Sequence, residues 1–167
     1  LIRARGMDDS SPAACVSLVN NALCRDNDEA MFVSAFYGVL DSASGKLCCC
    51  NAGHNPPLLR KADGTVEWFA AKGGPALGVI EDAAYEEMEI DFAPGDTLLL
   101  YTDGVTEAID EDDVPFGEDA LKDVFQRLGS ADPSAVADII ETVAAEHTGE
   151  AEQFDDITCL VVRRPAA

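Results

Sequence analysis

One segment, residues 96–105 (DTLLLYTDGV), limits the fold more than any other part of the chain. Its three consecutive leucines leave no polar side chain between them, so both faces of the segment are expected to be covered. This pattern is typical of a central strand in a packed sheet, although an apolar run of this length also fits a buried helix. Asp103 would then stand where the strand leaves the core. Gly104 would let the backbone turn there and approach an ion or ligand closely.

A second junction, residues 154–162 (FDDITCLVV), has the reverse order, because two carboxylates precede a β-rich segment. If the two strands are neighbours in one sheet, Asp103 and Asp155 converge on one point, where a divalent cation could bind. The plainer alternative is that each aspartate ends a turn, which is the usual role of Asp before Gly. Spacing alone favours this plainer alternative.

The order of the remaining patterns indicates an α+β fold with a mostly antiparallel sheet, because most β segments precede two helices and one last strand. The length of 167 residues suits a single domain over 1–167, with residues 1–10 as a disordered leader. Residues 72–78 are rich in glycine and are expected to form an exposed loop. The expected elements are a helix at 12–25, strands within 31–40, 46–51, 58–61, 66–69, 85–92 and 96–101, helices at 117–128 and from 132, and a final strand at 157–163.

The charge balance restricts the partners of the chain. Eleven Lys and Arg against 32 Asp and Glu give a net charge of −21, which argues against a nucleic-acid partner. Such a chain attracts hard cations, and an anionic substrate would need a metal or a local Arg to offset its field. The sequence contains no C-x-x-C pair and no bilayer-spanning apolar segment. Six cysteines are therefore expected to be free thiols in a reducing cytoplasm.

Other catalytic patterns are weak. Gly73 and Gly74 lack the Lys and Ser/Thr of a phosphate-binding loop, and no G-x-S-x-G motif occurs. His147 is interpreted as a surface residue at a helix C-terminus. His54, beside Asn55 in a turn between two β segments, could bind substrate or simply stabilise the turn.

Six short motifs, taken together, resemble the SpoIIE-type bacterial branch of the metal-dependent (type 2C, PPM) serine/threonine protein phosphatases. Each motif alone is unspecific, but all six occur in register over nearly the whole chain. They are MFVSAFYGVLD at 31–41, NAGHNPPL at 51–58, GPALG at 74–78, PGD at 94–96, YTDGVTEA at 101–108 and DDIT at 155–158.

The resemblance implies an αββα sandwich with Mg²⁺ or Mn²⁺ at one edge, two ions being expected in the complete domain. It implies that Asp103 and Asp155 are catalytic metal ligands, with Asp156 as the second choice. The implied reaction is hydrolysis of phosphoserine or phosphothreonine by a metal-activated water. His54 lies where many relatives carry a metal-binding aspartate, and we assign His54 and Asn55 to substrate binding.

The resemblance also implies a cytoplasmic signalling role, with a phosphorylated anti-anti-sigma type regulator as the substrate. The family's N-terminal acidic motifs, Gly-Asp-x-x-Asp and Asp-x-x-Gly-x-Gly, are not found in this sequence. We therefore expect a C-terminal piece of the domain, weak or inactive alone, with open sheet edges that would allow a homodimer. The alternatives are a catalytically inactive phosphatase-fold module that binds a partner and a plain metal-binding structural domain.

Overall fold

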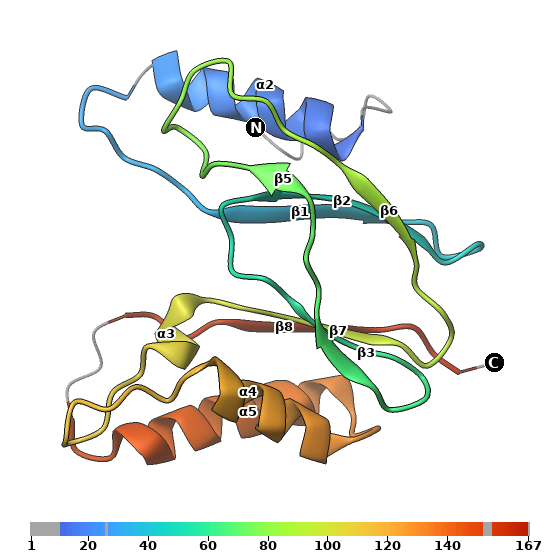
Figure 1. Ribbon diagram of the computed structural model, residues 1–167, viewed down its shortest axis with the longest axis vertical. Helices are drawn as coiled ribbons and strands as arrows, with labels where there is room; N and C mark the ends of the chain where they lie inside the picture. The colour runs from blue at the N-terminus through green and yellow to red at the C-terminus, as the bar shows by residue number, and fades with distance from the viewer. Residues whose placement is uncertain (1–10, 26, 152–154, 167) are drawn as a thin grey trace. The chain divides into compact units, whose positions relative to one another are not determined.

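The computed structural model describes residues 11–25, 27–151 and 155–166, which divide into two compact units. Unit 1 comprises Leu1–His54 and Ala70–Phe92, and unit 2 comprises Asn55–Phe69 and Ala93–Ala167. Each unit contains one four-stranded sheet, shown in Figure 1. The interpretation of 1–167 as a single domain stays a prediction. Among the described residues, no helix has the length and apolar character needed to cross a membrane.

Unit 1 is built from one helix and a sheet centred on β2. Helix α2 (Pro12–Arg25) starts where predicted, with the Ser11 hydroxyl accepting a hydrogen bond from the Ala14 amide. Val16 and Val19 of α2 are buried with residues of β2 in the core of this unit. Strand β2 (Lys46–Ala52) pairs antiparallel with β1 (Ala35–Leu40) and β6 (Met88–Asp91), and parallel with β5 (Gly73–Gly74).

The short strand β5 corrects the prediction of a loop over residues 72–78. A Cβ atom on Gly73 would lie 1.6 Å from the carbonyl oxygen of Asn51, so only glycine lets this segment reach β2. The glycine content that suggested a loop is therefore what permits the pairing. Strands β1 and β6 begin later than predicted, at Ala35 and Met88, whereas β2 begins at Lys46 as predicted. The six cysteines lie among the described residues, and none of them forms a disulfide.

Unit 2 contains the two acidic junctions. Its sheet has the order β4-β3-β7-β8, and all neighbouring strands are antiparallel. The apolar segment forms β7 in an interior position, which confirms the strand and rules out the buried helix. The strands are β3 (Leu58–Arg60), β4 (Val66–Trp68), β7 (Thr97–Tyr101) and β8 (Cys159–Arg163).

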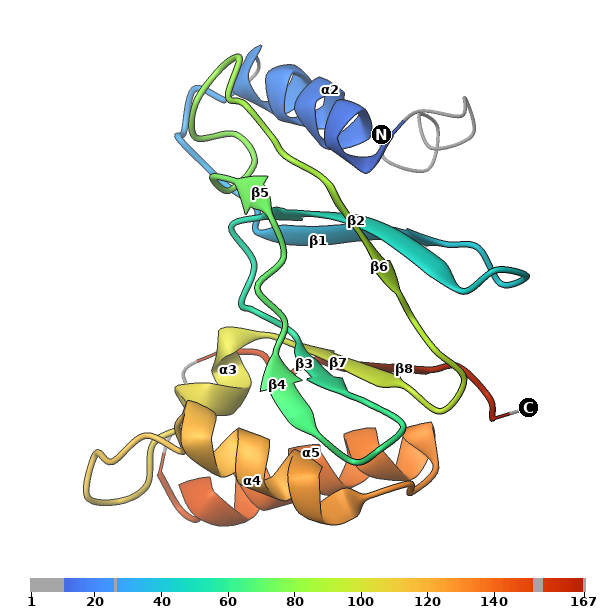
Figure 2. The same cartoon turned by 45° about the vertical axis from the view of Figure 1, so that its right-hand side comes forward.

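Two helices cover one face of this sheet, α4 (Glu118–Leu128) and α5 (Pro133–Thr148). Figure 2 shows them side by side below β3, β7 and β8. The α5 helix begins as predicted, because the Asp132 carboxylate accepts a hydrogen bond from the Ser134 amide. In β7, Leu99 and Tyr101 belong to the core shared with these helices. Because side chains alternate along a strand, Thr97 points to the same face.

Candidate metal centre at the end of β7

Asp103 lies where β7 ends, as the sequence predicted. It is the first residue of α3 (Asp103–Thr106), a single-turn helix that sequence patterns did not predict. Its side chain is exposed, and its Oδ1 accepts a hydrogen bond of 3.1 Å from the Gly104 amide. This local bond restrains the carboxylate at the surface of the protein.

Asp155 and Asp156 lie just before β8, and both are exposed. The Oδ1 atom of Asp155 accepts a hydrogen bond of 2.7 Å from the Asp156 amide. Asp103 and Asp155 therefore have the same local arrangement, in which the following backbone N–H orients the carboxylate. The first residue of the predicted junction, Phe154, lies outside the described residues.

Thr102 joins the two junctions. The β7–β8 ladder pairs Tyr101 with Cys159 and continues with a hydrogen bond of 3.0 Å from the Thr102 amide to the Thr158 carbonyl. The Thr102 hydroxyl donates to the Asp156 carbonyl at 2.8 Å and accepts from the Thr158 amide at 2.9 Å. These bonds hold the chain before β8 beside the end of β7.

Gly104 makes the two junctions touch. A Cβ atom at this position would lie 2.6 Å from the carbonyl oxygen of Asp156 and 3.3 Å from that of Asp155. Gly104 belongs to α3 and is not among the residues with positive φ, so it does not serve the sharp turn that we expected. Its role is to let the backbone of α3 approach the backbone of Asp155 and Asp156 closely. The predicted pairing of the two strands is confirmed. The convergence of the Asp103 and Asp155 carboxylates on one cation stays a prediction.

The donor set suits part of a shell for a hard cation. Carboxylate oxygens are the ligands that Mg²⁺ and Mn²⁺ prefer, and Mg²⁺ is often bound by one or two carboxylates together with water. Within residues 11–25, 27–151 and 155–166, no group of three or more His, Cys, Asp or Glu side chains is placed for one ion. Asp103 and Asp155 therefore fit as two ligands of an incomplete protein shell, and their metal-binding role, like that of Asp156, stays a prediction.

His54 and Asn55 follow β2. The amide of His54 donates to Asn51 Oδ1 at 2.7 Å, and Asn51 Nδ2 donates to the carbonyl oxygen of His54 at 2.8 Å. Gly53, with a φ of 71°, supports this turn. The turn-stabilising alternative thus has direct support in the backbone of His54. The two residues belong to different units, and their role in substrate binding stays a prediction.

Thr102 is the residue of the candidate site that the sequence patterns missed. A threonine after a strand is ordinary, and its positioning role depends on bonds to residues more than fifty positions away. The signal was available only in combination, because Thr102 and Thr158 come opposite each other only when the pairing of Tyr101 with Cys159 is continued by one residue.

The arrangement of helices and strands is that of a PP2C-type phosphatase domain. The SiaA-PP2C domain of Pseudomonas aeruginosa matches it with a TM-score of 0.79 and 26% sequence identity, over 97% of this chain and 63% of that one. This likeness confirms the α+β fold class. The sequence model described as Stage II sporulation protein E (SpoIIE) matches residues 1–165, and the chain belongs to this family.

Two curated relatives show which proteins carry a similar sequence. Protein IcfG of Synechocystis sp. is 33% identical over 150 residues, which is 89% of this chain and 23% of that protein. Phosphoserine phosphatase RsbU of Bacillus subtilis is 26% identical over 154 residues, 92% of this chain and 45% of that protein. The chain therefore spans less than half the length of either relative.

Proposed function

We propose that the protein containing this chain is a Mg²⁺- or Mn²⁺-dependent phosphatase that hydrolyses phosphoserine or phosphothreonine on a regulatory protein. The observation that carries this proposal is the backbone contact of Gly104 with Asp156, which brings the Asp103 and Asp155 junctions together. Membership in the SpoIIE family and the similarity to a phosphoserine phosphatase support the same reaction class.

Each residue of the site has a definite task in this proposal. Asp103 and Asp155 hold the cation through carboxylate oxygens, with Asp156 as the second choice. When bound, the cation supplies Lewis acidity, which lowers the pKa of bound water and offsets charge on a phosphoryl group. Thr102 fixes the separation of the two junctions through its bonds to Asp156 and Thr158. The amides of Gly104 and Asp156 orient the two carboxylates.

The charge of the chain explains why a cation would be needed. With a net charge of −21, the protein repels a phosphorylated partner unless positive charge is placed at the site. The partner class that fits is the phosphorylated anti-anti-sigma type of regulator implied by the resemblance. His54 and Asn55 are assigned to contacts with this substrate. A cytoplasmic location and a homodimer stay predictions.

The test is Mn²⁺-dependent phosphate release from p-nitrophenyl phosphate by the natural protein that carries this sequence. Asp103→Asn keeps the shape of the side chain and removes its charge, and Asp112→Asn makes the same change in an exposed loop residue. We expect the first variant to lose about 100-fold or more in rate, because a metal ligand supplies several kcal/mol of transition-state stabilisation. We expect the second variant to retain its rate.

Equal rates for Asp103→Asn and the unchanged protein would remove the proposed mechanism. A protein that binds its phosphorylated partner but releases no phosphate at any Mn²⁺ concentration would instead be the inactive binding module. The two outcomes are separated by measuring partner binding and phosphate release on the same preparation.

A further inference from the structure

At the other end of the same sheet, two arginines flank one threonine in a row across three strands. The register pairs Arg60 of β3 with Thr97 of β7, and Thr97 with Arg163 of β8. Because neighbouring strands lie about 4.8 Å apart, the two arginine backbones are separated by roughly 10 Å. Residues paired directly across strands point to the same face, so both guanidinium groups extend toward α4 and α5.

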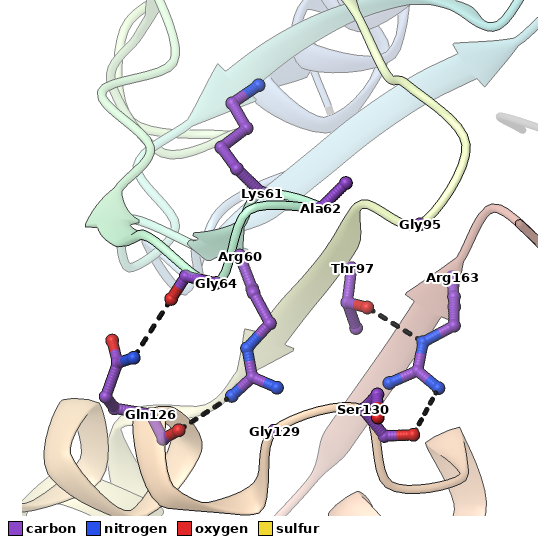
Figure 3. A pocket seen from close by; sticks show the side chains of 10 residues that line it. All are labelled: Arg60, Lys61, Ala62, Gly64, Gly95, Thr97, Gln126, Gly129, Ser130 and Arg163. Carbon is purple, nitrogen blue, oxygen red and sulfur yellow. Dashed lines mark hydrogen bonds between the residues drawn. The ribbon is translucent and has the colours of Figure 1, made fainter.

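These arginines line a pocket of about 180 Å³. Figure 3 shows both side chains extending from the sheet toward the end of α4 and the turn at Gly129 and Ser130, while Lys61 points away. Arg163 donates to Thr97 Oγ1 at 2.9 Å and to the Ser130 carbonyl at 3.0 Å. None of the residues that line the pocket is acidic.

Arg60 is the more buried of the pair, with 5% of its surface exposed. Its Nη2 donates to the carbonyl oxygens of Phe125 and Gln126, and its guanidinium carbon lies 4.9 Å from the centre of the Phe125 ring. Its buried Nε has no hydrogen-bond partner. Burial, and then the like charge of Arg163, lowers the pKa of Arg60. The positively charged guanidinium of Arg60 is thus held in the pocket, and no carboxylate in the lining neutralises it.

Two aspartates that interact with lining residues, Asp96 and Asp132, have partners of their own. Asp96 is paired with Lys61 at 3.4 Å and accepts hydrogen bonds from the amides of Ala62 and Ala93. Asp132, which feels the charge of Arg163, accepts bonds from the amide and hydroxyl of Ser134 at the start of α5. Neither aspartate lines the pocket.

Capping of α4 explains only part of this arrangement. Helix C-termini expose carbonyl oxygens, and a cation placed there is favourable. One arginine would suffice for that role, and it would not leave a buried donor without a partner. Two guanidinium groups that line one pocket, one of them with a donor to spare, suit the binding of a tetrahedral oxyanion.

We propose that this pocket binds a phosphate-type oxyanion between Arg60 and Arg163. The anion would accept hydrogen bonds from both guanidinium groups and relieve their mutual repulsion. The volume is below the roughly 300–1,000 Å³ of pockets for drug-sized ligands, so the site takes a single small group. About 13 Å of strand separates Thr97 from Tyr101, so this site is distinct from the aspartates beyond the end of β7.

The test is calorimetric titration of inorganic phosphate into the protein in the presence of EDTA, which removes any divalent cation that could bind phosphate elsewhere. Chloride at equal ionic strength is the reference. We expect saturable binding of phosphate, weakened about tenfold or more in Arg163→Gln because charge-assisted bonds are lost. The matched control is Arg127→Gln, an arginine whose side chain is 77% exposed in the last turn of α4, and it should leave the affinity unchanged.

A second measurement does not depend on any variant. In the unchanged protein, phosphate should shift the backbone amide resonances of Gly129 and Ser130 more than those of Gly104 and Asp156. Equal responses to phosphate and chloride, unchanged affinity in Arg163→Gln, or shifts confined to the acidic junctions would overturn the proposal.

Phosphoserine as a second ligand distinguishes free phosphate from a phosphate group on a protein side chain. Only a pocket that accepts a phosphate group carried on a chain will bind it. Since the metal is chelated throughout, loss of this site and loss of the phosphatase mechanism are distinguishable.

Discussion

The two ends of β7 differ in charge and in burial, although β7 and β8 contribute to both. The acidic end is formed by Asp103 and Asp155, which are exposed, and the basic end is formed by Arg60 and Arg163 on either side of Thr97. Apolar side chains that pack against α4 and α5 lie between the two ends. One antiparallel register therefore places opposite charges at opposite edges of a single core.

This difference in burial separates two kinds of site. Exposed carboxylates keep their hydration until a ligand replaces it, so a site made from them can exchange ions readily. A buried guanidinium must keep partners at all times, and Arg60 obtains most of them from α4. Changes at the basic end should therefore affect folding first, whereas changes at the acidic end should affect ligand binding first.

The largest expected effect is at the basic end. Phe125 is 1% exposed and lies under the Arg60 guanidinium, so Phe125→Ala removes both a core side chain and the support of a buried charge. We expect a loss of about 3–5 kcal/mol in the free energy of unfolding, measured by urea denaturation. The control is Phe32→Ala, because Phe32 is 67% exposed and its removal should change stability by less than about 0.5 kcal/mol. Similar losses in both variants would contradict the assignment of Phe125 to the core.

At the acidic end, the expected loss of stability is smaller, but it is accompanied by a change at the candidate metal site. Gly104→Ala places a methyl group 2.6 Å from the Asp156 carbonyl, and two backbones must separate to admit it. We expect a loss of about 1–3 kcal/mol in the free energy of unfolding, together with weaker Mn²⁺ binding measured by calorimetry. In the control Gly38→Ala, the new methyl group meets the flexible end of Leu47 at 3.2 Å. Unchanged Mn²⁺ binding in Gly104→Ala would show that the contact does not set the geometry of the site.

The sequence predicted the acidic end better than the basic end. The apolar run before Asp103 and the reversed pattern after Asp155 are local signals, and the pairing of β7 with β8 follows from them. Helix α3 was missed because a single turn has too few residues to show a period. A special role for Gly104 was predicted for the wrong reason. The glycine is needed for the close approach of a backbone segment that is distant in sequence, and not for a sharp turn.

The basic end could not be predicted in this way. Arg60 and Arg163 are separated by 103 positions, and each resembles an ordinary charged residue at the end of a strand. Their juxtaposition depends on two registers, β3 with β7 and β7 with β8, and an error of one residue in either would place them on opposite faces. The same limit applies to β5, whose pairing with β2 depends on a contact that only the folded chain defines.

Thr102→Val gives a smaller effect that tests the link between the two junctions. The change keeps the shape of the side chain but removes its bonds to the Asp156 carbonyl and the Thr158 amide. We expect a loss of about 1–2 kcal/mol in the free energy of unfolding, measured by urea denaturation, because two hydrogen bonds are lost. Thr158→Val is the control, since the bonds that hold Thr158 in the ladder come from its backbone. If both variants lose the same stability, the Thr102 hydroxyl is not the link.

The smallest expected effect is a pH dependence at the start of β8. Burial, with a further contribution from the negative charge of Glu141, raises the pKa of the Cys159 thiol from 9.0 to about 11. In the unfolded chain the thiol loses its proton near its ordinary pKa, whereas the folded protein keeps the proton until higher pH. The stabilising contribution is therefore complete below about pH 9 and is lost as the pH rises toward 11.

Between pH 8 and pH 9.5, this thiol should lower the free energy of unfolding by about 1 kcal/mol or less. The measurement is urea denaturation at both pH values, for the unchanged protein and for Cys159→Ala. The variant cannot titrate at this position. Its free energy of unfolding should therefore fall less between the two pH values, by the contribution of the thiol. Identical pH dependences would mean that Cys159 is hydrated in the folded protein. Water would then reach the acidic end more readily than the hydrogen bonds of Thr102 imply. The difference in burial between this end and Arg60 would be larger.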